Sequence, residues 1–254
     1  MVSLKRHRNA KNNASNHTDL ITTVVHELKT PITTIKEAIS LLSDLNYLKL
    51  DAKSKKILLI AREETNRLVR MVNNLLKVSI IEAGKLQLHL EPTKIEVIIN
   101  QVLDSQSFTI QKKEMHIKTN CLHNSPTVII DRDRLYDAIA NLIDNALKFT
   151  PEKGTITIQT RQIKPGDIEY RKQHLNSKLK YLETTISDTG PGISKQDLTR
   201  IFKKFERIKA PIPIRGIGLG LTIAKNIIEL HEGKIWASFN KSKGATFHFA
   251  LPIK

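Results

Sequence analysis

The stretch ITTVVHELKTPITTIKEAISLL, residues 21–42, decides the fold of the first part of the chain. Its apolar residues recur at alternating steps of four and three positions, which is the heptad spacing of a helix in a coiled coil or helical bundle. The seam consists of Ile21, Val25, Leu28, Ile32, Ile35, Ile39 and Leu42. His26 falls just beside this seam, so we expect its imidazole on the solvent-facing flank of the helix, where it is free to react.

A second heptad pattern runs from about Asp51 to Ala83, and Gly84 follows it as a helix end. Its seam consists of Ile57, Ala61, Leu68, Met71, Leu75 and Val78, with Glu64 in the remaining layer. Two such helices joined by a short polar turn form an antiparallel hairpin. One hairpin cannot bury both of its apolar faces, so residues 17–86 are predicted to form a homodimer with a four-helix bundle.

Composition restricts the class of protein. The 254 residues leave room for two modest domains, and an apolar content of 40% is enough for real cores. No run approaches the roughly 18 apolar residues of a membrane span, and the basic segment 1–16 lacks the apolar core of a signal peptide. The single cysteine, Cys121, excludes an internal disulfide framework and suits a reducing cytosol. We therefore expect a cytoplasmic location.

The formal net charge of +16 raises the question of an anionic partner. Lysine and arginine are spread along the whole chain rather than gathered in one tract, and aromatic residues make up only 5%. A nucleic-acid groove usually combines a basic track with aromatic stacking platforms. We therefore expect no nucleic-acid binding, and we expect the charge to favour a small anionic ligand and a carboxylate-lined protein partner.

A change of pattern after a polar linker at residues 87–93 marks a second domain, residues 94–254. Helical spacing occurs at residues 94–106 and 132–148, and alternating apolar residues predict half-buried strands at residues 155–158, 184–187 and 245–251. Helices on one face of a mixed sheet form an α/β sandwich. The expected architecture is thus α+β multidomain: a helical hairpin forming a dimeric four-helix bundle, followed by this sandwich.

A charged stretch, residues 164–181, lies between two of the predicted strands. It is longer than an ordinary hairpin turn. A tolerated surface loop is the simpler interpretation, and a docking element is the alternative.

Three polar side chains share one face of the predicted helix 132–148, because Asn141, Asn145 and Lys148 follow at steps of four and three. An amide oxygen can bind Mg²⁺ without the repulsion that a carboxylate would bring to a triphosphate. A lysine can neutralise phosphate oxygens. Paired asparagines on a helix are also common on ordinary surfaces, so this pattern alone is no proof of a nucleotide site.

Two glycine-containing segments follow. In the sequence DTGPGI, residues 188–193, an aspartate at a strand end can accept a hydrogen bond from an exocyclic amine, and glycines let the backbone close against a flat ring. In the sequence GIGLGL, residues 216–221, backbone N–H groups at a helix start can face phosphate. The latter spacing matches neither the dinucleotide fingerprint nor the P-loop.

The sequence HELKTP, residues 26–31, resembles the phospho-acceptor box of sensor histidine kinases, and three further boxes of that family follow in the expected order. The resemblance covers roughly residues 15–254. It implies a dimerisation and histidine phosphotransfer domain followed by an ATP-binding domain of the kinase, gyrase and Hsp90 type. It also implies ATP and Mg²⁺ as cofactors and the receiver domain of a response regulator as partner.

The resemblance also implies roles for single residues. His26 would accept the phosphoryl group, Glu27 would orient the imidazole and take a proton from it, and Thr30 would align a water for dephosphorylation of the regulator. Asn145 would hold Mg²⁺, and Asp188 would accept from the adenine amino group. The nucleotide-binding residues implied are Asn141, Asn145, Lys148, Phe149, Asp188, Gly190, Gly192, Phe202, Phe205, Arg207, Gly216, Gly218, Leu219, Gly220 and Thr246.

The segment that would form the lid over ATP departs from the family pattern. Arg215 and Ile217 stand where the family often has Gly and Ser or Thr. The segment 208–215 is short and carries Pro211 and Pro213. These departures leave lid ordering open.

The sequence therefore predicts a protein-histidine kinase that phosphorylates itself on His26 and passes the phosphoryl group to an aspartate of a response regulator, with regulator dephosphorylation as a further activity. Two alternatives remain open: an ATPase of the same nucleotide fold without self-phosphorylation, and a non-catalytic dimeric docking scaffold. No sensor domain is recognisable, so we expect one upstream of Met1 or on another protein.

Overall fold

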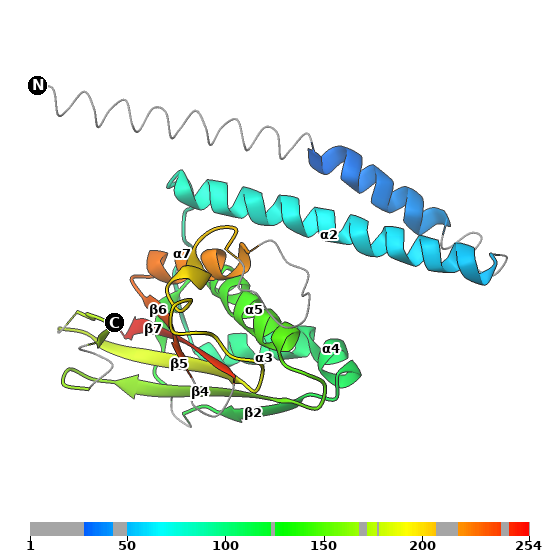
Figure 1. The fold of residues 1–254 in the computed structure, drawn as a ribbon. Coiled ribbons are helices and arrows are strands. Elements are labelled where there is room, and N and C mark those ends of the chain that lie inside the picture. Colours follow the sequence, from blue (N-terminus) through cyan, green and yellow to red (C-terminus); the bar gives the residue numbers. More distant parts are fainter. Residues whose placement is uncertain are drawn as a thin grey trace, which may run out of the picture. The chain divides into compact units, whose positions relative to one another are not determined.

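The computed structural model of the protein describes residues 28–42, 50–122, 125–167, 172–176, 178–206, 218–239 and 244–253. The chain divides between Leu86 and Gln87 into two compact units, one helical and one that contains the sheets (Figure 1).

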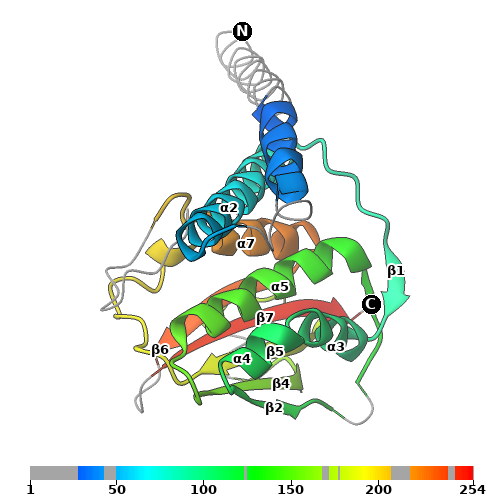
Figure 2. The same ribbon diagram turned by 90° about the vertical axis from the view of Figure 1, so that its right-hand side faces the viewer.

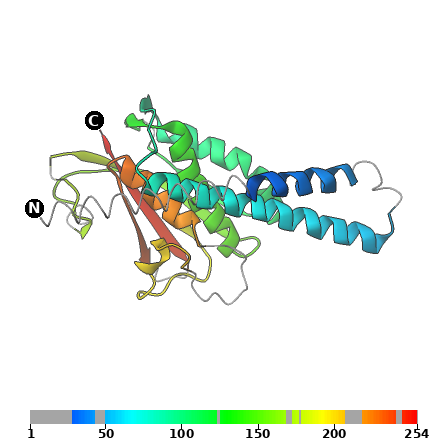
Figure 3. The ribbon, with the colours of Figure 1, turned by 90° about the horizontal axis from the view of Figure 1, so that it is seen from above.

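The helical unit contains two helices that run side by side in opposite directions (Figures 1 and 3). Residues 28–42 form the first described helix, and α2 spans Ala52–Glu82. Asp51 caps α2, because its side-chain oxygen accepts a hydrogen bond of 2.7 Å from a backbone N–H in the first turn. Gly84 follows the helix end in the left-handed conformation, with φ of 64°. The predicted hairpin is thus present.

Much of the apolar seam stays exposed in the single chain. Ile35 is 51% exposed and Ile57 is 59% exposed. The exposed apolar side chains of the two helices are Leu28, Ile35, Leu41, Leu42, Ile57, Leu59, Ile60 and Leu68. In the described part of the chain, no helix is both long and apolar enough to cross a membrane.

The second unit contains a five-stranded sheet, a two-stranded sheet and helices. Its strands are β1 (Glu91–Thr93), β2 (His116–Asn120), β3 (Val128–Ile130), β4 (Thr155–Ile163), β5 (Lys180–Asp188), β6 (Lys234–Phe239) and β7 (Ala245–Ile253). Its helices are α3 (Ile95–Ser105), α4 (Ser107–Lys112), α5 (Arg132–Phe149) and α7 (Gly220–Leu230), with the 3₁₀ helix η2 (Arg200–Phe202).

The large sheet has the strand order β2-β4-β5-β7-β6. Strands β2 and β4 are parallel, and all other neighbours in this sheet are antiparallel. The register places Ile158, Ile186 and Phe247 beside one another on three adjacent strands. All three are buried, because they face the layer of helices α3, α5 and α7 that covers this side of the sheet (Figure 2).

Several elements differ from the sequence expectation. The segment expected as a linker contains β1, which pairs with β3 in the second unit. The short elements β2, α4 and β6 carry too few residues for a clear periodic signal and were not predicted. Of the charged stretch 164–181, the last two residues belong to β5. Leu175 and Leu179 from this stretch pack with Trp236 against buried residues of the sheet.

A buried histidine joins the end of α7 to the start of α5. The backbone N–H of Asp131 donates to Nε2 of His231 (2.9 Å), so Nδ1 carries the hydrogen and donates to the carbonyl of Ile227 (2.8 Å). Burial lowers the pKa of His231, although Ile227 and Asp131 oppose this effect. Burial alone would raise the pKa of Asp131, but the N–H groups of Arg134 and His89 outweigh it and hold that pKa below its usual value.

This arrangement predicts that His231 makes unfolding dependent on pH. Its folded pKa lies below the unfolded value of about 6.5, so the unfolded chain binds a proton first as the pH falls. Stability from the neutral ring is fully present above about pH 6.5 and is lost below it, by at most roughly 1.4 kcal/mol per pH unit. We expect His231→Gln to reduce this slope in urea unfolding between pH 5 and 7.5. The matched control is His174→Gln at an exposed histidine, and curves of equal slope for the wild type and His231→Gln would contradict the assignment.

Candidate functional site

Helix α5 carries one apolar face and one polar face. Asp131 caps its start by accepting from the backbone N–H of Arg134 (3.0 Å). The apolar face is buried and consists of Leu135, Ala138, Ile139, Leu142, Ile143, Ala146 and Leu147. Burying this face leaves Asn141 and Asn145 half-buried and Lys148 exposed on the other side. The Lys148 ammonium forms an ion pair with Asp144, one turn earlier on the same helix.

The start of α7 lies directly against Asn141. The side-chain amide of Asn141 donates to the carbonyl of Asp137 (2.7 Å), which fixes the orientation of its Oδ1. A methyl group at Gly220 would lie 2.9 Å from this Oδ1, so only glycine leaves the amide in place. Helix α5, which carries Asn141, and the start of α7, which carries Gly220, are therefore neighbours in the fold although they are far apart in the sequence.

Asp188 is the buried acid of this site. It ends β5, is 4% exposed, and its Oδ1 accepts from the N–H of Gly190 (2.8 Å) and of Ala245 (3.2 Å). Burial raises the pKa of Asp188, while these two N–H donors oppose the rise. Among the described residues, no donor contacts Oδ2. This oxygen can therefore accept a hydrogen bond from a ligand.

Glycines around Asp188 allow three segments to meet closely. A methyl group at Gly190 would lie 2.8 Å from the carbonyl oxygen of Phe149, at the end of α5. A methyl group at Gly244, just before β7, would lie 1.8 Å from the carbonyl oxygen of Asp188. Gly244 also has φ of 96°, which residues with a Cβ rarely adopt. The predicted site residues Phe149, Asp188, Gly190 and Gly192 are thus brought together at the ends of α5, β5 and β7.

The residues just before and just after segment 207–217 contact each other. The N–H of Phe205 donates to the carbonyl of Gly218 (3.0 Å), and a methyl group at Gly218 would lie 2.5 Å from the carbonyl oxygen of Glu206. Phe205 is 59% exposed with φ of 59°. Phe202, in contrast, packs edge-on against Phe247 with ring centroids 6.4 Å apart. The two predicted phenylalanines therefore differ, because Phe202 lies in the core and Phe205 is exposed.

The predicted residues Leu219 and Gly220 follow this contact: Leu219 is the N-terminal cap of α7, and Gly220 is its first residue. Leu219 is buried, and the hydroxyl of Thr222 donates to the carbonyl of Phe202 (3.1 Å). The start of α7 is thereby fixed to η2, and its first N–H groups have no partner within the helix. Such groups suit an anionic ligand, because the helix dipole also favours negative charge there.

The donor set fits a purine nucleotide with Mg²⁺. Asp188 supplies a buried acceptor for an exocyclic amine, and glycines line a close approach. Asn145 supplies an amide oxygen, a ligand type that Mg²⁺ accepts beside phosphate oxygens. Within the described ranges, no group of three or more His, Cys, Asp or Glu side chains could hold a metal ion. The amide oxygen of Asn145, together with phosphate oxygens of a bound nucleotide, would be suitable ligands for Mg²⁺ here.

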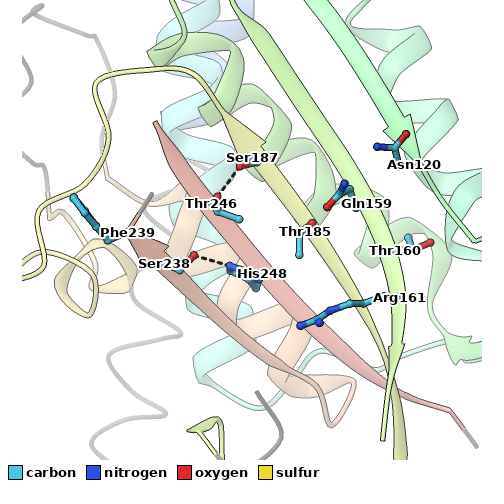
Figure 4. Close-up of a pocket in the computed structure, with 10 residues that line it drawn as sticks. All are labelled: Asn120, Gln159, Thr160, Arg161, Thr185, Ser187, Ser238, Phe239, Thr246 and His248. Carbon is cyan, nitrogen blue, oxygen red and sulfur yellow. Dashed lines mark hydrogen bonds between the residues drawn. The ribbon is translucent and has the colours of Figure 1, made fainter. Parts of the chain in front are cut away.

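Thr246 lies elsewhere. Side chains alternate along β7, so Ala245 faces Asp188 while the hydroxyl of Thr246 points to the opposite face of the sheet. There it forms a hydrogen bond of 2.6 Å with the hydroxyl of Ser187 (Figure 4). The Thr246 side chain therefore does not lie with the group formed by Phe149, Asp188, Gly190 and Gly192, which is called the Asp188 cluster here. The backbone N–H of Ala245 takes part in its place.

That opposite face carries a polar groove of about 610 Å³. Its lining residues are Asn120, Gln159, Thr160, Arg161, Thr185, Ser187, Ser238, Phe239, Thr246 and His248 (Figure 4). The carboxylate of Glu183, which is fully buried, binds Arg161 and lies 3.0 Å from Nδ1 of His248. Burial would raise the pKa of Glu183, but bonds from His248 and Arg161 outweigh it and lower that pKa. This face thus has its own ion pair, between Arg161 and Glu183, and its own hydrogen bond between His248 and Glu183. Its side chains are on the opposite side of the sheet from Asp188.

Four predicted residues, His26, Glu27, Arg207 and Gly216, lie outside the described residues. Thr30 is described and is exposed on the first helix, where its carbonyl accepts from the hydroxyl of Thr34 (3.2 Å).

Some contributors to the site were missed in the sequence. The N–H of Ala245 and the carbonyl of Phe149 act through the backbone, so no side-chain pattern marks them. Asp144, which pairs with Lys148, could have been found from its spacing of four residues on the same helix.

Two protein families match the chain. The family described as "His Kinase A (phospho-acceptor) domain" matches residues 16–84. The family described as "Histidine kinase-, DNA gyrase B-, and HSP90-like ATPase" matches residues 130–254.

Curated relatives match nearly the whole chain. The sensor histidine kinase WalK of Bacillus subtilis is 32% identical over 242 residues, which cover 93% of this chain and 36% of WalK. The adaptive-response sensory kinase SasA of Synechococcus elongatus is 28% identical, over 92% of this chain and 58% of SasA. The chain thus spans about a third of the first relative and less than two thirds of the second.

Solved structures with the same fold include histidine kinases. Full-length ShkA in complex with AMPPNP aligns with a TM-score of 0.74 at 27% identity, over 92% of this chain and 45% of ShkA. The histidine kinase AdeS of Acinetobacter baumannii aligns with a TM-score of 0.60 at 25% identity, over 90% of this chain and 98% of that structure.

The close contact at Gly244 generates a stability prediction with a matched control. Gly244 and Gly166 both have positive φ, 96° and 109°, but a methyl group at Gly166 meets nothing within 4 Å. Alanine at either site costs backbone strain of about 1 kcal/mol. Only Gly244→Ala adds an overlap with the backbone of Asp188, so we expect it to lower the free energy of unfolding by roughly 2 kcal/mol more than Gly166→Ala does. Urea unfolding measures both, and equal losses would show that the packing at Asp188 is looser than described.

Proposed function

Because the chain belongs to the sensor histidine kinases, with a phospho-acceptor domain followed by their ATPase domain, we propose that it transfers the γ-phosphoryl group of ATP to His26. The observation that carries this proposal is the buried carboxylate of Asp188, whose Oδ1 is held by two N–H groups while Oδ2 has no donor among the described residues. An adenine amino group is the donor that such an oxygen can recognise. Guanine presents a carbonyl at the same ring position, so the site would favour ATP over GTP.

The phosphate end of the nucleotide is proposed to lie between α5 and the start of α7. Asn141 and Gly220 adjoin one another there, and Lys148 and the N–H groups of α7 can meet phosphate oxygens. Asn145 would hold Mg²⁺, which would neutralise charge as it develops on the transferred group. Phe202 and Phe205 would anchor the lid, and Arg207 would face the γ-phosphate; Gly190, Gly192, Gly216, Gly218 and Leu219 would complete the backbone of the pocket.

The proposed chemistry at His26 is an in-line displacement. The lone pair of Nε2 attacks the γ-phosphorus, the bond to the bridging oxygen breaks, and ADP leaves. Glu27 accepts the proton of Nδ1 and so makes Nε2 the better nucleophile. The phosphohistidine then passes its phosphoryl group to an aspartate in the receiver domain of a response regulator.

A homodimer through residues 17–86 is part of the proposal. The seam residues Leu28, Ile35, Ile57 and Leu68 are each at least 45% exposed in the single chain. A second copy that packs against them would complete a four-helix bundle and remove this apolar area from water.

The first prediction for this function concerns His26. The full chain is incubated with γ-labelled ATP and Mg²⁺, with His26→Gln as test variant and His116→Gln, at an exposed histidine of β2, as control. We expect acid-labile, base-stable label on the wild type and on His116→Gln, and none on His26→Gln, because only His26 lies in the phospho-acceptor box. ATP binding by His26→Gln should stay close to normal, because the nucleophile and the nucleotide site lie in different domains.

Three outcomes separate the alternatives. Label on His26→Gln would refute the assignment of the nucleophile. Free phosphate without labelled protein would indicate an ATPase of the same fold, and the absence of both would indicate a docking scaffold.

A second prediction concerns Thr30, which lies one helical turn after His26, so its hydroxyl would face the same partner surface. We propose that it aligns the water that hydrolyses the regulator's phosphoaspartate. Thr30→Ala should keep autophosphorylation within about threefold and reduce regulator dephosphorylation by roughly tenfold or more. Thr34→Ala, one further turn along the exposed helix, is the control, and dephosphorylation in the presence of ADP is the measurement. Equal rates for wild type and Thr30→Ala would leave Thr30 as a surface residue.

A further inference from the structure

The last turn of α5 is held from outside by a lysine at the corner between α4 and β2. The ammonium of Lys113 donates to the carbonyl oxygens of Leu147 (2.6 Å) and Thr150 (2.7 Å). The last carbonyls of a helix lack partners within the helix and carry partial negative charge. One half-buried cation therefore satisfies two carbonyls at the end of the helix and opposes the charge there.

The backbone sets Lys113 in this position. Lys113 directly follows α4 as its C-terminal cap, and Glu114 after it adopts the left-handed conformation with φ of 50°, which turns the chain toward β2. The carbonyl of Lys113 accepts from the N–H of Lys153 (2.9 Å), beyond the end of α5. The corner therefore binds the turn after α5 through the backbone and the last helical turn through the side chain.

The last turn of α5, which Lys113 contacts, lies next to the residues proposed to bind the nucleotide. Its residue Lys148 is one of the proposed phosphate contacts, and Asn145 lies one helical turn before Phe149. The carbonyl of Phe149 leaves no room for a methyl group at Gly190, which would lie 2.8 Å away. Gly190 in turn donates to Asp188. A movement of the last turn of α5 must therefore be passed on to the Asp188 turn, to Lys148, or to both.

We propose that Lys113 is a positioning residue of the nucleotide site. Its ammonium bonds to the carbonyls of Leu147 and Thr150, neither of which is a proposed ATP-binding residue. Its role would be to set the distance between the last turn of α5 and the turn after Asp188. This inference rests on the proposed function, because it assumes that ATP binds between these two segments.

The test compares three variants in the full chain. Lys113→Met removes the two carbonyl bonds at similar side-chain length, Lys113→Arg restores a cationic donor, and Lys112→Met, at an exposed lysine of α4, is the matched control. Calorimetry with ATP and Mg²⁺ at 25 °C gives Kd, and autophosphorylation gives KM and kcat. Hydrogen exchange of the amides at residues 146–150 without nucleotide reports whether the turn has loosened.

Loss of two charge-assisted hydrogen bonds should raise Kd and KM of Lys113→Met about tenfold or more. The change in kcat should stay within about threefold, because the reacting groups are intact. Amides 146–150 should exchange faster in Lys113→Met, and Lys113→Arg should return Kd to within roughly threefold of the wild type. Lys112→Met should match the wild type.

Folded Lys113→Met with wild-type Kd would overturn the positioning role, even with a lowered melting temperature, because Lys113 would then serve stability alone. Should Lys113→Met not fold, Lys113→Gln, which keeps a neutral donor, replaces it, and a wild-type Kd there would equally overturn the role. A wild type that binds no ATP would instead refute the proposed function itself.

Discussion

The burial of one carboxylate, that of Asp188, is the constraint on which the geometry of the site depends. A carboxylate removed from water is costly unless donors surround it. Here the backbone N–H groups of Gly190 and Ala245 supply this compensation at a single oxygen. The two donors come from the turn after β5 and from the start of β7. Both segments must therefore lie within hydrogen-bond reach of the end of β5, and glycine at Gly244 is what makes the approach sterically possible.

The same constraint extends to the helices. Because the turn that holds Gly190 lies against the carbonyl of Phe149, the end of α5 has a defined distance from Asp188. The start of α7 is set by its contact with Asn141, and the buried pair of His231 and Asp131 joins the other ends of the same two helices. Lys113 completes the arrangement at the last turn of α5. The polar groove on the opposite face has none of this convergence, since its acid Glu183 already binds Arg161 and His248.

Much of the fold could be predicted from the sequence because its patterns are long. The second heptad helix was expected at about Asp51 to Ala83 and spans Ala52–Glu82, since thirty-odd residues average out local exceptions. Strands β1 and β3 have three residues each, which is too few for an alternating apolar pattern to be recognised. The sandwich was predicted, whereas the pairing of β1 with β3 depends on contacts between distant segments that no local pattern contains.

The candidate site shows the same division. Glycine and aspartate in DTGPGI indicated a tight turn and an acceptor, and both are present at Asp188. Thr246 was expected in the site, but alternation along β7 turns its side chain away and presents the N–H of Ala245. A hydrogen bond from the backbone has no residue-type signal, so only the register of the strand could reveal it. Lys113 was missed for a related reason, because it acts on carbonyl groups thirty-four and thirty-seven residues away.

ATP is proposed to bind where α5, β5 and β7 converge and to contact Oδ2 of Asp188. Backbone amide NMR of the full chain during titration with ATP and Mg²⁺ tests it most directly. We expect the largest chemical-shift changes at the amides of Gly190 and Ala245, because both donate to the same carboxylate that the ligand would contact. We expect little change at Arg161 and Ser238 on the opposite face of the sheet. Saturable changes centred on those groove residues, with Gly190 and Ala245 unmoved, would contradict it.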